Sequence, residues 1–467
     1  MSKGSVPAGA AIVLCLMVTG LAVGAPPTLE SVTVTPAARS LSVGQKQRYT
    51  ATGMFSDGST QELGAAIHSI AAGYEHTCVL LTSVGVDCWG INEMGQRGDG
   101  TTDDSLIPRP VKWITTATGL ALGLEHTCAL LASGAVQCWG RNDFGELGNG
   151  TRSHATRPVR VMGITSSTQV ASGWYYSCAL LASGSVRCWG HNVEGMLGDG
   201  TYSGSVIPVK VVGISSAVGL AAGDEHTCAV LASGVVRCWG RNDAGQLGNG
   251  TTTNSNVPVT AKGINNATAV VAGSLFSCAL LAGGSVQCWG TNSSGVLGIG
   301  SNEGSSSVPV SVTGISTAVS ITAGYQHACA LLSSGSVQCW GSNYYGEIGN
   351  GSTSVWGAGT PVTAVVADEP VKLAAGSFYT CALLSDGAMR CWGKNDSGQL
   401  GDQRMTDDPN PLPVAVVGTP GVVWQSSDPT KATITMRGMA AGVGRGNTTI
   451  TATTSGFIND NAVLTVQ

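Results

Sequence analysis

Charged residues are scarce in this chain of 467 residues: Asp, Glu, Lys and Arg make up 11% of it, and the net charge is −5. No long basic run occurs, so the electrostatic attraction that drives most nucleic-acid binding has no support. Aromatic residues contribute only 5%, whereas glycine occurs 67 times. This composition favours an all-β protein rich in tight turns and excludes a helical bundle.

Long apolar runs are also missing, apart from one near the N-terminus. Lys3 precedes an apolar run over 10–23, and the small residues at 22–24 offer a cleavage site before Ala25. This pattern predicts a signal peptide over 1–24, with an uncleaved anchor as the alternative. Because no other stretch could span a bilayer, we expect a soluble protein that is secreted or at the cell surface (extracellular or periplasmic), without membrane insertion after signal removal.

A unit of about 50 residues recurs seven times. Its clearest copy, over 221–250, is AAGDEHTCAVLASGVVRCWGRNDAGQLGNG. The first five Cys-Trp-Gly anchors are 50 residues apart, and the last two steps are 51 and 52. Each unit contains about four short apolar segments of strand length. Four strands per unit at this period predict a seven-bladed β-propeller over 65–418.

The ends of the repeat array suggest how the ring closes. A Pro-Val-x-Val segment, or a close variant of it, opens each unit after the first, as at 208–211. The first copy lacks this segment, whereas a spare one follows the seventh copy at 413–416. We therefore expect the final strand to complete the first blade and to bring residues near 66 and 418 together.

The cysteines occur in regularly spaced pairs along the sequence. Without Cys15 of the signal, fourteen remain, two per repeat and ten residues apart. A three-residue loop at 132–134, with Gly134 left-handed, would place Cys128 directly opposite Cys138. In the first copy Val84 replaces that glycine, so its pair is the least secure. The predicted disulfides are Cys78–Cys88, Cys128–Cys138, Cys178–Cys188, Cys228–Cys238, Cys278–Cys288, Cys329–Cys339 and Cys381–Cys391.

Metal binding is the alternative use of these cysteines. Four copies carry His-x-Cys, but zinc sites need three or four converging ligands, usually with Cys pairs two to four residues apart. The remaining copies have Tyr176, Phe276 and Tyr379 in place of His, and phenylalanine cannot be a ligand. We therefore interpret this position as packing, and expect no metal. The four histidines are His76, His126, His226 and His327.

The rest of the repeat is expected to be scaffold. The Trp of each Cys-Trp-Gly should fill the core between blades. In the tail over 240–250, glycine and asparagine should supply positive-φ turns, with Leu247 in the core. The tail is not a phosphate loop, because no Gly-Lys-Ser/Thr follows. No catalytic residue and no cofactor is predicted.

The segments that flank the repeats alternate apolar and polar residues as strands do, at 31–35, 47–55, 432–435, 448–453 and 462–466. Together, 31–63 and 421–467 resemble the group-2 bacterial immunoglobulin-like domain, including its FSDGSTQ turn and its WQSSDP segment. The resemblance implies that the propeller is inserted into one loop of a small β-sandwich, whose parts are 25–64 and 419–467.

The repeats resemble the regulator of chromosome condensation family over about 67–418. The matching positions include Gly223, Trp239 and Asn242, and the Gly-Gln-Leu-Gly of 245–248. The resemblance implies a seven-bladed propeller. It also offers guanine-nucleotide exchange as a function, which export argues against, and the secreted propeller-type β-lactamase inhibitory protein as an example of a pure binding module.

Comparing the copies with one another separates scaffold from free positions. The two residues after Ala-x-Gly vary most and should ring one face of the propeller. Large aromatic residues, which interface hot spots favour, are frequent there; partly buried packing is the alternative. A second variable region, the loop over 351–360, carries Trp356. The candidate partner-binding residues are Tyr74, Trp174, Tyr175, Tyr325, Phe378 and Trp356.

These observations favour a secreted or cell-surface protein-binding module, a monomer and not an enzyme, whose partner is another protein. The immunoglobulin-like domain would serve as a spacer. The alternatives are a propeller enzyme with an acidic central site, to which Glu75, Glu125 and Glu225 could contribute, and an exchange factor. No Ser-His-Asp or Cys-His arrangement stands outside the repeated positions.

The cysteine pairing predicts the result of a thiol titration. Folded, unreduced protein purified without the 1–24 segment should give almost no reactive thiol, and reduction in denaturant should expose all fourteen. Many free thiols before reduction would contradict the pairing.

Overall fold

The computed structural model describes residues 29–55, 60–63, 67–81, 85–366, 369–385, 387–417, 423–434, 439–453 and 459–467. The predicted signal peptide and Val84 therefore lie outside the described residues. Within them the chain is almost entirely β-strand, with one short 3-10 helix, η1 (Ser293–Gly295). The all-β prediction is confirmed.

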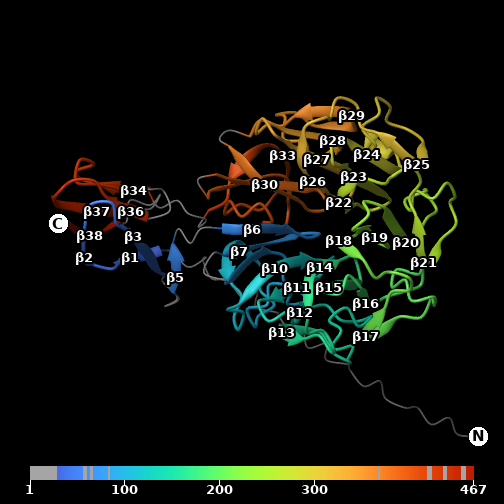
Figure 1. Cartoon of the computed structure of the whole chain (residues 1–467), viewed down its shortest axis with the longest axis horizontal. Coiled ribbons are helices and arrows are strands. Elements are labelled where there is room, and N and C mark those ends of the chain that lie inside the picture. Colours follow the sequence, from blue (N-terminus) through green and yellow to red (C-terminus); the bar gives the residue numbers. More distant parts are fainter. Residues whose placement is uncertain are drawn as a thin grey trace, which may run out of the picture.

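Seven four-stranded antiparallel sheets stand around a common axis and form the blades of a propeller (Figure 1). Within each blade the strand order follows the chain order. The blades are β6 (Ile67–Ala72), β7 (His76–Leu81), β8 (Val86–Gly90) and β9 (Ser105–Pro110); β10 (Ala117–Leu122), β11 (His126–Leu131), β12 (Val136–Gly140) and β13 (Ala155–Arg160); β14 (Ser167–Ser172), β15 (Tyr176–Leu181), β16 (Val186–Gly190) and β17 (Ser205–Lys210); β18 (Ala217–Ala222), β19 (His226–Leu231), β20 (Val236–Gly240) and β21 (Ser255–Thr260); β22 (Ala267–Ala272), β23 (Phe276–Leu281), β24 (Val286–Thr291) and β25 (Ser305–Ser311); β26 (Ala318–Ala323), β27 (His327–Leu332), β28 (Val337–Asn343) and β29 (Ser354–Thr363); β30 (Pro370–Ala375), β31 (Tyr379–Leu384), β32 (Met389–Asn395) and β33 (Thr406–Ala415).

The hairpin between the second and third strands of each blade has the register that the sequence predicts. Gly134 has φ 77°, and Cys128 lies directly opposite Cys138. All seven cysteine pairs are joined as disulfides, and their Cα–Cα distances are 4.0 or 4.1 Å. Cys78–Cys88 is among them. Each bond connects adjacent strands of one blade and does not connect blades.

The prediction for ring closure is wrong. The last Pro-Val-x-Val segment does not complete the first blade: it lies in β33, where Val414 pairs with Cys391 of the same blade. In every blade the corresponding segment is the outermost strand and pairs with the Cys-Trp-Gly strand that precedes it in the chain, because sequential strands most often lie next to each other. The ends still meet, since Ile67 and Val416 share one buried cluster.

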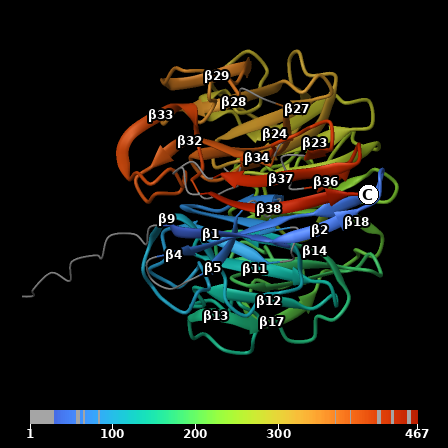
Figure 2. The same cartoon turned by 90° about the vertical axis from the view of Figure 1, so that its left-hand side faces the viewer.

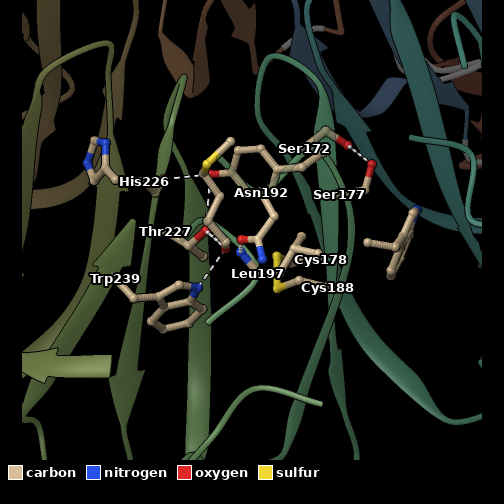
Figure 3. Close-up of a disulfide and its surroundings, with 12 residues drawn as sticks. Ser172, Ser177, Cys178, Cys188, Asn192, Leu197, His226, Thr227 and Trp239 are labelled. Atoms are coloured by element: carbon tan, nitrogen blue, oxygen red, sulfur yellow. Dashed lines mark hydrogen bonds between the residues drawn. A yellow bond between two sulfur atoms is a disulfide. The ribbon is translucent and has the colours of Figure 1, made fainter. Parts of the chain in front are cut away.

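The blades are joined by the tryptophan of each Cys-Trp-Gly, which is fully buried in every copy. Its indole Nε1–H donates to a backbone carbonyl in the tail of the preceding blade, as Trp239 does to Met196 at 2.8 Å. Figure 3 shows this contact beside the Cys178–Cys188 disulfide. The first blade closes the ring in the same way, because Trp89 donates to the Gln399 carbonyl of the seventh (2.9 Å). The tryptophan prediction is confirmed.

The contacts of the tail explain why its sequence recurs from copy to copy. The glycine two residues after the accepting carbonyl sits against the indole: a Cβ on Gly248 would lie 2.8 Å from Trp289 Nε1. The asparagine does not supply a positive φ, contrary to the prediction. Instead, Asn242 Oδ1 accepts from the Leu247 backbone N–H (2.9 Å), and its Nδ2 donates to the Thr251 and Thr253 carbonyls. The side-chain amide thereby folds the tail around Leu247, which is fully buried as predicted.

Strands from both ends of the chain pair with one another beside the propeller (Figures 1 and 2). The segment expected as one strand over 47–55 forms two strands in different sheets, broken at Tyr49, which is buried in the core of this unit. The sheets are β1 (Leu29–Thr35), β4 (Thr50–Phe55) and β5 (Thr60–Leu63); β2 (Ala38–Leu41), β38 (Asn459–Val466), β37 (Gly446–Thr453) and β34 (Val423–Ser426); and β3 (Lys46–Arg48), β36 (Met439–Gly442) and β35 (Ala432–Ile434).

The tail glycines yield a test with an internal control. Gly248 (φ 69°) and Gly263 (φ 76°) share a backbone conformation, but a Cβ on Gly263 would meet nothing within 4 Å. Gly263→Ala should cost about 1 kcal/mol of unfolding free energy, from the left-handed conformation alone. Gly248→Ala should cost at least about 2 kcal/mol more, because it also displaces the indole. Denaturant unfolding measures both, and equal losses would contradict the interlock.

Candidate functional site

The histidines of the His-x-Cys positions link neighbouring blades. All four are fully buried, and each Nε2 lies 2.8–2.9 Å from a hydroxyl oxygen of the next blade, as His226 does from Ser277. Burial lowers the pKa of His226 to about 3. These imidazoles are therefore neutral when folded, and because the unfolded chain binds their protons more readily, stability should fall as the pH drops below about 6.5. Among the described residues, no group of three His, Cys, Asp or Glu side chains is placed to hold a metal.

In the three copies without histidine, an aromatic residue occupies the same position, and the two tyrosines also contact a hydroxyl group of the next blade. The hydroxyl of Tyr176 lies 3.0 Å from Thr227 Oγ1, and the hydroxyl of Tyr379 lies 2.8 Å from Thr77 Oγ1. Phe276 has no polar group to offer, and the next blade has Ala328 where the other blades have Ser or Thr. The polar pair has thus been replaced on both sides of one interface.

Seven glycines line the propeller axis, and each one follows the first strand of its blade: Gly73, Gly123, Gly173, Gly223, Gly273, Gly324 and Gly376. A Cβ on Gly223 would lie 2.3 Å from the Gly273 carbonyl oxygen, and the contacts continue around the ring until Gly376 meets the Gly73 carbonyl. Side chains are therefore excluded from this layer. The glycines line a pocket of about 100 Å³, the axial pocket, together with the residues that precede them in all seven blades and those that follow them in six.

Five of the six predicted partner-binding residues gather around this pocket: Tyr74, Trp174, Tyr175, Tyr325 and Phe378. We call them the axial aromatic cluster. Trp174 and Tyr325 are nearly parallel, with ring centroids 6.2 Å apart. Phe378 joins Tyr325 to Tyr74, at centroid distances of 5.2 and 5.9 Å. All five are half-buried, so they combine mutual packing with an accessible surface, which we call the axial face.

Trp356 is not part of the cluster. It lies in β29 with 74% of its surface exposed, and its carbonyl accepts from Asn302 Nδ2 at 2.9 Å. Sequence reasoning also missed Phe144 and Tyr345, which extend the cluster outward against Tyr175 and Phe378 at 5.2 and 5.6 Å. Both occupy the fourth residue of the tail after Cys-Trp-Gly, a position that varies between copies and that the same internal comparison could have found.

The glutamates considered for an acidic ring do not line the axial pocket. Each is bound to a cation: Arg141 lies between Glu125 (2.6 Å) and Asp143 (2.7 Å). Arg241 and Lys394 lie in the same way between two carboxylates, those of Glu225 and Asp243 and those of Glu75 and Asp396. Arg141 also covers the Tyr175 ring at 4.9 Å. Since each cation meets two carboxylates, each triad keeps a net negative charge.

Asp224 is the residue at the axial pocket that sequence reasoning did not single out. It is the only carboxylate among the residues that line the pocket, and its backbone carbonyl accepts from the Trp174 N–H (3.2 Å). Burial raises its pKa to about 7, with a further rise from Glu225 and opposing effects of Ser274 and Arg241. Asp224 can therefore exchange a proton near neutral pH.

Comparison with known protein families finds one repeat type along the propeller. The regulator of chromosome condensation (RCC1) repeat matches residues 67–96, 118–146, 168–195, 217–246, 267–296, 318–347 and 371–399, and a second description of the same repeat matches 133–180, 183–230, 233–280 and 283–331. Together the two cover more than half of the chain. Among curated proteins, human E3 ubiquitin-protein ligase HERC2 is 35% identical over 92 residues, which are 20% of this chain and 2% of HERC2.

Solved structures share the fold. Human WBSCR16 is 26% identical, with a TM-score of 0.62 over 68% of this chain and 87% of that one. Prp20p from Saccharomyces cerevisiae is 22% identical, with a TM-score of 0.65 over 78% and 91%. That yeast protein was also solved bound to Kap60, at 20% identity and a TM-score of 0.64 over 80% and 89%. These likenesses establish the seven-bladed propeller.

The replacement of the polar pair by Phe276 and Ala328, at the interface of the fifth and sixth blades, predicts an energetic coupling between these two positions. Phe276→His alone should destabilise the fold by about 1–3 kcal/mol, because its Nε2 would be buried against Ala328 without a partner. Adding Ala328→Thr should recover at least about 0.5 kcal/mol by restoring the pair. Unfolding of the single and double variants measures the coupling energy. Phe276→His combined with Thr127→Ala, at a distant interface, is the additive control; equal coupling in both pairs would contradict this account.

Proposed function

Because the chain belongs to the family of regulator of chromosome condensation (RCC1) repeat proteins, we propose that it is a non-catalytic module that binds another protein through its axial face. The yeast relative Prp20 is bound to Kap60 in one structure and was studied for binding to Gsp1p and histones in another. Propellers of this fold can therefore bind proteins, while the identity of the partner depends on each chain's own surface.

One observation carries the proposal: the positions that differ most between the blades form a continuous aromatic surface around the axial pocket. The scaffold explains the positions that recur, including tryptophan, cysteine and the tail glycines. It does not require Trp174 or Tyr325, because Leu124 and Ser274 occupy the equivalent places in other blades. Half-buried tryptophan and tyrosine next to a pocket are the residues that most often carry binding energy at protein interfaces.

We further propose that the protein is secreted or held at the cell surface as a monomer, with 1–24 as its signal peptide. Its disulfides indicate an oxidising compartment. Among the described residues, no helix has the length and apolar character needed to cross a membrane. The paired strands at the two ends support our assignment of 25–64 and 419–467 to a group-2 bacterial immunoglobulin-like domain that acts as a spacer.

The proposal predicts the outcome of a capture experiment with the full chain as bait and secreted and surface proteins as prey. Trp174→Ala combined with Tyr325→Ala should weaken capture of the principal partner at least about 30-fold, the effect of a hot-spot loss of about 2 kcal/mol. Trp113→Ala removes an exposed tryptophan outside the axial pocket and is the matched control. Unchanged capture by the double variant, with unfolding and disulfides unaltered, would reject the axial face.

A further inference from the structure

The axial pocket combines a ring of glycine backbone with one carboxylate in its wall. The glycine ring brings neighbouring backbones so close that no side chain fits between them, so backbone groups line the pocket at this layer. Trp174, Tyr325 and Tyr74 line the pocket together with Asp224. Within the described part of the chain, the buried Oδ2 of Asp224 accepts no hydrogen bond. A buried carboxylate oxygen without a partner is costly, which makes this position a candidate for a ligand.

The aromatic rings favour one sign of charge. The faces of tryptophan and tyrosine attract cations, most strongly where water is displaced. Two nearly parallel rings, those of Trp174 and Tyr325, and one carboxylate therefore define a small site that favours a cation and opposes an anion.

The surroundings of the pocket strengthen this preference. The cations nearest the axial aromatic cluster, Arg141 and Lys394, and the equivalent Arg241 are each bound between two carboxylates. None of the three lines the axial pocket. Exposed Asp407 and Asp408 add negative charge at the rim of the seventh blade, where Asp407 borders a groove with Tyr344 and Tyr345. A partner with a basic surface is the electrostatic complement of this face.

We propose that the axial pocket is a recognition site for a primary alkylammonium group, presented as a lysine side chain by the protein partner. The inference rests on the proposed function, because the partner's lysine would reach the pocket across the axial aromatic cluster. A pocket of about 100 Å³ suits the compact ammonium better than the planar guanidinium of arginine. The lysine stem would lie along the aromatic rings and its head would lie near Asp224.

The test uses n-butylammonium as a probe of the lysine side chain and butan-1-ol as its uncharged counterpart. Titration into the full-length protein is followed at the indole Nε1–H resonance of Trp174, which is identified by its loss in Trp174→Phe. The ammonium should give a saturable shift at about pH 8, and butan-1-ol should bind at least about fivefold more weakly. Equal shifts by both probes would show an apolar pocket, and no saturable shift by the ammonium would remove the site; either result overturns the inference.

Two variants test whether the carboxylate of Asp224 is the charge that binds the ammonium group. Asp224→Asn should weaken butylammonium binding at least about fivefold, whereas Asp243→Asn, which removes a carboxylate of the Arg241 triad outside the pocket, should leave it nearly unchanged. Equal losses in both variants would indicate surface attraction only and would contradict the site. Thermal unfolding checks that both variants fold.

The unaltered protein provides a second readout through pH. Because the pKa of Asp224 is about 7, its carboxyl loses charge as the pH falls, so affinity for butylammonium should decrease between about pH 8 and pH 6. The Ser274 side chain, which is hydrogen-bonded to the carboxyl group, opposes the rise of its pKa; the charged groups that act on it are Glu225 and Arg241, and the titratable Tyr74 lines the same pocket. Asp224→Asn should abolish this dependence, and its persistence would contradict the assignment. If the probe fails while Trp174 and Tyr325 remain essential for capture, the ammonium site falls and the binding function stands.

Discussion

The structure depends on the hydrogen bond between each buried indole N–H and a carbonyl of the preceding blade. A tryptophan is the largest apolar side chain, and its one polar atom must find a partner when it is buried. The carbonyl lies in a tail whose glycine leaves room for the ring, as Gly248 does for Trp289. Since the first and seventh blades use the same contact, through Trp89, the ring closes without exchanging a strand. Blade packing is therefore specified seven times by one local pattern.

The disulfides stabilise single blades, whereas the hydroxyl contacts join neighbouring blades. Cys228–Cys238 holds the two central strands of one blade, whereas His226 and Ser277 connect two blades. The replacement of this pair by Phe276 and Ala328 at one interface shows that packing is retained when polarity is lost on both sides together. With the core determined by these contacts, the residues that follow the axial glycines are left free to differ, and they provide the binding surface.

Closure of the propeller ring also brings together the two terminal segments that form the small unit beside it. The propeller begins and ends in one buried cluster, which holds Ile67 and Val416. Two chain segments that meet there can pair outside the ring, as Gln47 does with Ala440 and Ala38 with Val463. Neither terminal segment has enough apolar residues to form a core alone, and their shared core includes Val34 from one end and Leu464 from the other.

The amino-acid sequence by itself determined the number of blades, the hairpin register, the cysteine pairs and the positions free to vary, because each depends on local spacing within a unit of about 50 residues. It did not determine to which blade the Pro-Val-x-Val strand belongs, since a repeat can be divided at any point without changing its period. It also did not reveal the role of Asp224. Only the tertiary structure places that carboxylate beside Trp174 and Tyr325 from other blades, because residues 50 or more apart meet only when the ring closes around its axis.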